Sequence, residues 1–197
     1  MVLTRVDGKT RMTIRGLETR ATSAECPAGG EWIAIRFKLG TFMPTVPVGS
    51  ILDRRDVDLP RATKHRFWLD GGAWEYPSYE NAETFVKRLA QRGLIACDPL
   101  VDAVLHGRRS DLSMRSAQRR FLRATGLTYG AYRQIERARH ATDLLTRGVA
   151  ILDAVHDAGY FDQAHLTRSL KSLIGQTPRE VARGQTQLSF LYKTDAS

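Results

Sequence analysis

Cysteine is scarce in this chain, with only Cys26 and Cys97 among 197 residues. Two cysteines are too few for a disulfide framework or an all-cysteine zinc site, and two lone thiols are typical of a reducing compartment, where we expect both to pack as small apolar side chains. Long apolar runs are also missing, since none approaches the roughly 18 residues that a membrane-spanning helix requires. The N-terminal residues alternate apolar and polar side chains instead of forming a secretion signal. We therefore expect a cytoplasmic protein that does not bind membranes.

Residues that usually carry metal or catalytic chemistry are also few. His65 is the only histidine before residue 98, so the paired histidines of a metal-binding cupin are missing, and we predict no metal and no cofactor. No Gly-x-Ser-x-Gly elbow, glycine-rich phosphate-binding loop or His-Glu-x-x-His motif stands out. The carboxylate pair Asp56 and Asp58 alternates on a predicted strand, which indicates exposed polar positions. We therefore expect no enzyme and assign no catalytic residue.

Positive charge, in contrast, is abundant: 30 Lys and Arg against 21 Asp and Glu give a net charge of +9. This balance favours a polyanionic partner. Much of the excess is concentrated, since residues 115–139 contain seven Arg and a single acid, Glu136. Residues 1–97 are more balanced, with 15 basic and 11 acidic side chains. The second half therefore holds the basic block that a polyanion would contact.

The hydrophobic period changes near residue 97, and this change predicts two domains. A helix is expected after Asn81, ending at Gly93, and from Asp98 onward the whole pattern is helical. The predicted fold class is α+β, with a β-rich domain at residues 1–97 and an all-α domain at residues 98–197. The strand-like segments of the first half are residues 1–6, 12–17, 32–39 and 67–69.

The second half repeats itself at an offset of 49 residues. Each copy begins with an N-cap residue, Ser113 or Asp162, and ends at a glycine, Gly126 or Gly175, suited to the left-handed conformation. A shorter helix and a turn precede each copy, which is the order of a helix-turn-helix. We therefore predict two such motifs, joined by a linker helix over residues 131–146.

One face of each repeated helix is expected to pack inward and the other to face DNA. Arg can bond guanine, Gln can bond adenine, an alanine methyl can meet a thymine methyl, and Ser or Thr can bond phosphate. The predicted inward residues are Met114, Ala117, Phe121, Ala124, Gln163, Leu166, Leu170 and Leu173. The candidate base readers are Arg115, Gln118, Arg119, Gln163, Ala164, His165 and Arg168. The candidate phosphate contacts are Ser116, Arg120, Arg123, Thr167 and Lys171.

The second half resembles the AraC/XylS family of transcriptional regulators in two segments, LSMRSAQRRFLRATGLTYGAY and AGYFDQAHLTRSLKSLIGQTPREV. The resemblance covers about residues 98–182. It implies two recognition helices in successive major-groove segments about one turn (~34 Å) apart, and it assigns the base-facing role to the seven candidate base readers. This chain departs from the family at Leu166 and Leu170, where aromatics are usual, and at residues 107–113, which make a longer first turn.

In that family the N-terminal domain commonly senses a small molecule or dimerises the protein, and the β-rich first half resembles this arrangement. We therefore expect a sequence-specific DNA-binding transcription regulator, controlled through its N-terminal domain, with double-stranded DNA as its partner. A small-molecule effector and RNA polymerase stay open as further partners, as does the choice between monomer and homodimer. The alternatives are a non-specific basic nucleic-acid-binding protein and an enzyme with an appended DNA-binding domain.

Aromatic residues bear on two further expectations, the type of nucleic acid bound and the packing of the first half. Neither recognition helix shows an exposed aromatic residue on which a base could stack, so RNA is disfavoured as the partner. The aromatic residues of the first half are expected to pack in its core, with an apolar ligand pocket as the alternative. They are Trp32, Trp68, Trp74, Tyr76 and Tyr79.

Overall fold

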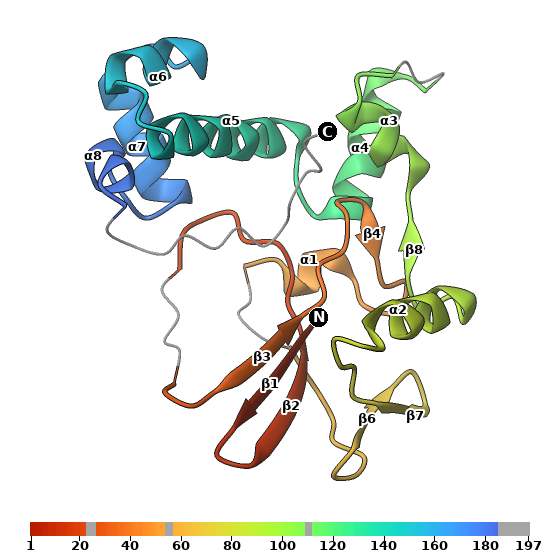
Figure 1. Cartoon of the computed structure of the whole chain (residues 1–197). Helices are drawn as coiled ribbons and strands as arrows, with labels where there is room; N and C mark the ends of the chain where they lie inside the picture. The colour runs from red at the N-terminus through yellow and green to blue at the C-terminus, as the bar shows by residue number, and fades with distance from the viewer. Residues whose placement is uncertain (23–26, 54–56, 109–111, 185–197) are drawn as a thin grey trace. The chain divides into compact units, whose positions relative to one another are not determined.

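The computed structural model describes residues 1–22, 27–53, 57–108 and 112–184 (Figure 1). By their contacts these residues form two compact units. The first unit takes its described residues from Met1–Leu17 and Ala24–Gly126, and the second from Glu18–Ser23 and Leu127–Phe190. This division lies further along the chain than residue 97, so a domain boundary at residue 97 stays a prediction. The α+β class holds, with a β-rich first part and a helical second part.

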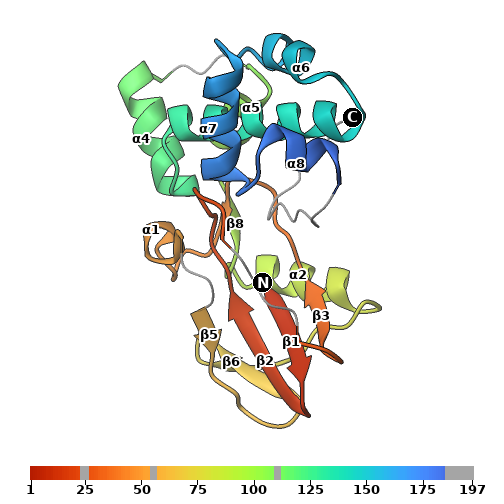
Figure 2. The same cartoon turned by 90° about the vertical axis from the view of Figure 1, so that its left-hand side faces the viewer.

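A four-stranded antiparallel sheet in the order β3-β1-β2-β5 forms one part of the first unit (Figure 2). Its strands are β1 (Val2–Val6), β2 (Lys9–Ile14), β3 (Glu31–Ala34) and β5 (Val57–Leu59). Asp7 and Gly8 turn the chain between β1 and β2 with positive φ angles of 49° and 70°, as a tight two-residue hairpin requires. Leu3 faces Met12 across this hairpin, and both side chains are buried in the core of the unit.

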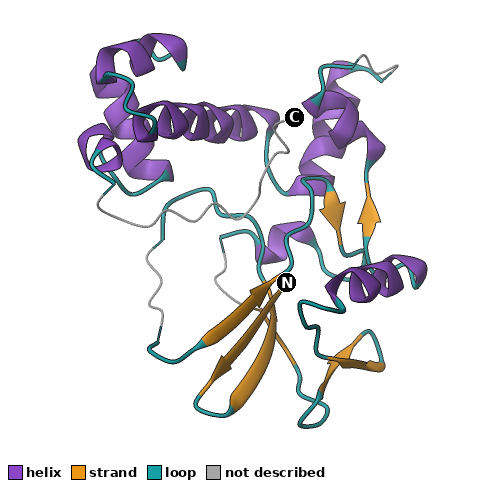
Figure 3. Cartoon of the chain, viewed as in Figure 1, coloured by secondary structure: helices purple, strands orange, loops and turns teal. Residues whose placement is uncertain are grey.

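The remaining elements of the first unit are short. Two strand pairs occur, β4 (Thr41–Phe42) with β8 (Ala96–Cys97) and β6 (Arg66–Leu69) with β7 (Gly72–Glu75). The helices are α1 (Val48–Ile51), α2 (Ala82–Gln91), α3 (Pro99–Leu105) and α4 (Met114–Thr125). All strands of the described residues belong to this unit (Figure 3).

The expected core packing of the first-half aromatics is only partly correct. Trp74 is buried against Phe85 at 5.8 Å between ring centroids, and the half-buried Tyr76 stacks on a neighbouring phenylalanine. Trp32, Trp68 and Tyr79 are exposed. Trp32 lies on the edge strand β3, Trp68 alternates outward between two buried neighbours of β6, and Tyr79 precedes α2 in a loop.

Two further predictions for the first half concern the two cysteines and the carboxylate pair Asp56 and Asp58. Cys97 is exposed, so its expected burial is wrong, because it ends the two-residue strand β8. Cys26 lies outside the described residues. Asp58 lies exposed on β5 and pairs with Arg11 at 2.6 Å, as a polar surface position would, whereas Asp56 also lies outside the described residues.

The second unit is a helical cluster around one long helix (Figure 1). Helix α5 (Tyr129–Thr146) contacts α6 (Ile151–Asp157), α7 (Gln163–Leu173) and α8 (Pro178–Ala182). Small residues of α5 let its partners approach closely, since Ala138 and Ala141 are fully buried beside Leu145. Leu166 and Leu170 of α7, which stand where the family usually has aromatics, are fully buried in the same core.

The 49-residue repeat is confirmed in the helix caps. The side chain of Ser113 accepts a hydrogen bond from the backbone N–H of Ser116 at the start of α4. Asp162 does the same for His165 at the start of α7, at 2.6 Å. Both contacts satisfy an N–H group that the first helical turn leaves without a partner.

The ends of the two repeated helices also correspond. Gly126 and Gly175 have φ angles of 75° and 81°, a conformation that costs other residues energy. Thr128 and Thr177 then cap the next helices, α5 and α8. Thr177 forms a capping box with Glu180. Each repeat therefore specifies where its helix starts, where it ends and where the next helix begins.

Candidate nucleic-acid interface

Helix α4 packs one face against its own unit and leaves a basic face exposed. Phe121 and Ala124 are buried, and the helix contacts α1, α3 and β4. Met114 is 75% exposed, so its predicted inward position is wrong. Burial begins at the half-buried Ser116 and Ala117, whereas the first residues of α4, Met114 and Arg115, are exposed. The exposed polar side chains are Arg115, Gln118, Arg119, Arg120 and Arg123.

Two of the residues predicted to contact phosphate have partners inside the unit. The Nε of Arg120 donates to Oδ2 of Asp98 at 2.8 Å, and this hydrogen bond together with the charge of Asp98 raises the pKa of Arg120. The hydroxyl of Ser113 donates to the half-buried hydroxyl of Ser116 at 3.0 Å. The phosphate role of Arg120 and Ser116 stays a prediction, as does that of Arg123, which is exposed on α4.

Helix α7 shows the same division between a buried and an exposed face. Gln163 is exposed, so its predicted inward position is wrong, and as with Met114 it is the first residue of its helix. Thr167 is half-buried and its hydroxyl donates to the carbonyl of Gln163 at 2.8 Å. Phe161, which directly precedes the cap residue, is 91% exposed. The other exposed candidates on α7 are Ala164, Arg168 and Lys171.

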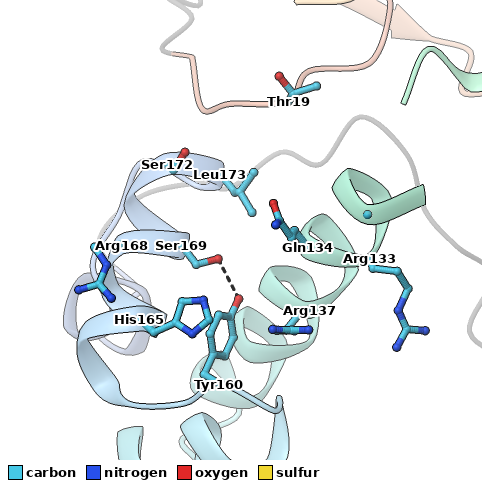
Figure 4. Close-up of a pocket in the computed structure, with 11 residues that line it drawn as sticks. Thr19, Arg133, Gln134, Arg137, Tyr160, His165, Arg168, Ser169, Ser172 and Leu173 are labelled. Carbon is cyan, nitrogen blue, oxygen red and sulfur yellow. Dashed lines mark hydrogen bonds between the residues drawn. The ribbon is translucent and has the colours of Figure 1, made fainter. Parts of the chain in front are cut away.

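A cavity of about 610 Å³ lies between α5 and α7 within the second unit (Figure 4). Its lining includes two predicted base readers, His165 and Arg168, so the structure brings these two residues together. The full lining is Thr19, Gly130, Arg133, Gln134, Arg137, Tyr160, His165, Arg168, Ser169, Ser172 and Leu173.

Tyr160 organises one wall of this cavity. Its hydroxyl shares a hydrogen bond of 2.9 Å with Ser169, and burial raises the pKa of its phenol. The half-buried His165 ring packs edge-on against the Tyr160 ring at 5.1 Å. The guanidinium of Arg137 lies 5.6 Å from the centre of the same ring, a cation–π contact. Figure 4 shows Arg137 and His165 on either side of Tyr160.

The two repeated helices thus share matching caps and exposed polar faces. Residues 107–184 match the family model described as a helix-turn-helix domain. This segment is less than half of the chain and contains both α4 and α7. The match supports the AraC-type resemblance over these residues and indicates DNA binding and transcription regulation. No curated protein and no solved structure matches the chain.

Sequence reasoning missed three residues of the helix-turn-helix domain that line the cavity. It assigned the linker helix to packing alone and so overlooked Arg133 and Arg137, although their spacing of four residues places them on one face of α5. It also assigned no role to Tyr160, which lies between α6 and α7.

None of the described helices is long and apolar enough to cross a membrane.

Proposed function

We propose that the chain is a sequence-specific DNA-binding transcription regulator of AraC/XylS type that reads two neighbouring major-groove segments with α4 and α7. The observation that carries the proposal is the repeated helix within the matched segment. Both copies have the same type of cap, the same left-handed glycine, a buried apolar face and an exposed face with arginine. Arginine on an exposed helix face suits base edges in the major groove.

The assignment of roles follows exposure and chemistry. On α4 the base readers are Arg115, Gln118 and Arg119, and on α7 they are Gln163, Ala164, His165 and Arg168. The phosphate contacts are Ser116, Arg120, Arg123, Thr167 and Lys171. Among the residues of the second set, the exposed side chains of Arg123 and Lys171 suit a phosphate contact best.

We infer that the N-terminal part regulates DNA binding through its direct contacts with α4 in the first unit. Helix α4 contacts α1 and β4, which come from the β-rich part of the chain. A Cβ added at Gly126, directly after α4, would lie only 3.0 Å from Val48 of α1. A ligand or a second subunit that shifted α1 or β4 would therefore act on α4 through direct packing.

The test is selection of bound sequences from fragmented genomic DNA by the purified protein, followed by salt titration on the selected site and on random DNA. We expect a single type of site with two short boxes about one helical turn apart, bound ~10³-fold or more tightly than random DNA. The charge control is Arg147→Ala, because Arg147 follows α5 and pairs with Asp143 at 3.0 Å. Equal affinity and equally steep salt slopes on both DNAs would contradict the proposal and favour a non-specific basic binder.

A further inference from the structure

Among the residues that the structure describes, those that line the cavity between α5 and α7 have positive or neutral side chains. Three arginines contribute to its lining, Arg133, Arg137 and Arg168, and no carboxylate does. Gln134 and Ser172 add neutral hydrogen-bond donors. A concave site of this composition suits an anion with several acceptor oxygens.

These three arginines also differ from their neighbours in the same unit. Arg139 pairs with Glu136 at 2.8 Å and Arg147 pairs with Asp143 at 3.0 Å. No described carboxylate forms such a pair with Arg133, Arg137 or Arg168. Like charges gathered around one cavity repel each other, and an anionic ligand would remove that repulsion.

The wall of the cavity prepares Arg137 to bind such a ligand. Its guanidinium stacks over the ring of Tyr160, whose hydroxyl is bound to Ser169 of α7. A stacked guanidinium keeps the N–H groups in its plane available for hydrogen bonds to oxygen. The space beside Gly130 on the wall of α5 is open, since a Cβ at this position would meet no atom closer than 4.0 Å.

The position of Arg168 indicates which anion would enter. Its side chain belongs both to the exposed face of α7 and to the lining of the cavity. A ligand in the cavity would thus lie beside the groove that α7 is proposed to read, where the sugar-phosphate backbone runs. We propose that the cavity between α5 and α7 binds a backbone phosphate of the DNA, held by Arg133 and Arg137 of the linker helix. This inference rests on the proposed function.

The experiment compares wild type, Arg133→Ala, Arg137→Ala and the double variant on the selected site. Duplexes carrying a single neutral methylphosphonate, moved one position at a time, identify the phosphates that matter. We expect wild type to lose about 10- to 100-fold in affinity at one or two adjacent positions, the size of a charge-assisted hydrogen bond. The double variant should be weaker throughout and insensitive to neutralisation at those positions.

The control is Arg147→Ala, which removes the same charge from outside the cavity. Arg133→Ala serves as the second variant, because Arg133 is exposed and its removal leaves the Tyr160 contacts intact. Thermal unfolding of each variant confirms that it is folded. A double variant that keeps the wild-type sensitivity at every phosphate would overturn the inference while leaving sequence-specific binding in place.

The experiment distinguishes failure of the proposed sequence-specific binding from failure of the phosphate inference. If wild type shows no sequence preference, the salt slopes of the variants on random DNA still decide the inference. A slope lower by about one for the double variant than for Arg147→Ala, which corresponds to the loss of one phosphate contact, supports phosphate binding by the cavity. Equal slopes overturn it.

Discussion

The Nε of Arg120 lies 2.8 Å from Oδ2 of Asp98, and this ion pair fastens α4 to α3. The other oxygen of the same carboxylate, Oδ1, accepts a hydrogen bond from the backbone N–H of Leu100 at 2.9 Å. The Asp98 side chain therefore caps α3 and also holds α4. The Asp98 side chain is only 8% exposed, so water cannot fully replace either Arg120 or the Leu100 N–H as its hydrogen-bond partner.

Asp98→Ala is expected to lower the free energy of unfolding by about 1–3 kcal/mol, because it removes both a helix cap and a buried charge-assisted hydrogen bond. Asp98→Asn keeps an oxygen for the cap and should lose less. Urea unfolding with constant m-values measures both changes. Arg120→Ala should also destabilise, whereas Arg123→Ala, an exposed arginine of the same helix, should not. Equal stability of the Arg120→Ala and Arg123→Ala variants would contradict a structural role for the ion pair between Arg120 and Asp98.

Arg168→Ala tests base reading by the second recognition helix. Because its guanidinium is exposed on α7, its loss should cost about 1–3 kcal/mol of binding on the selected site and relax the preference at one base position. Competition binding against single-base variants of the site measures both effects. An equal loss on the selected site and on random DNA would reject base reading.

Arg123→Ala tests a phosphate contact on the first recognition helix. Arg123 lies exposed in the last turn of α4, two residues before the end of the helix. Its removal should weaken binding to specific and random DNA alike and lower the salt slope by about one. An unchanged slope would exclude Arg123 from the phosphate contacts.

Two glycines of the second unit should respond oppositely to alanine. Gly175 has a φ of 81° and a Cβ there would lie 3.0 Å from that of Ala21, so Gly175→Ala should destabilise by about 1–2 kcal/mol. Gly130 lies inside α5 with open space around it, and Gly130→Ala should be neutral or stabilising by up to about 1 kcal/mol. Thermal unfolding compares the variants directly, and the same sign for both would contradict this prediction.

Burial, with a contribution from the charge of Glu136, raises the pKa of Tyr132 to about 12 from an ordinary value of 10.0. Above pH 10 the unfolded chain releases a phenol proton that the folded protein keeps, so stability should fall as the pH rises toward 12. Tyr132→Phe removes this dependence. The difference in unfolding free energy between wild type and Tyr132→Phe should therefore shift against wild type between pH 10 and pH 12. A constant difference over this range would contradict the burial of the phenol.

The helical repeat was predictable because its signals are local. Cap residues such as Ser113 and Asp162 act on backbone groups three residues away, and a left-handed glycine acts on its own turn. These contacts form wherever the short motif occurs. The start and end of α4 and α7 therefore follow from the sequence without knowledge of the fold.

Tertiary features were less predictable. Helical periodicity assumes a packing partner along the whole helix, so it could not show that the first residues, Met114 and Gln163, extend beyond that partner. The cavity depends on how α5 lies against α7, which no short motif encodes. The same holds for the contacts of α4 with α1 and β4, which place α4 in the β-rich unit although the hydrophobic period already changes near residue 97.

The cap residues and closing glycines of the two repeated helices carry no proposed base-reading side chain. Exchanges at Arg115 or Arg168 would leave every capping contact in place, because those contacts use the backbone and a separate set of side chains. During evolution a lineage could therefore acquire a new target promoter through surface substitutions alone. The ends of α4 and α7 would stay fixed while the proposed base-reading side chains change.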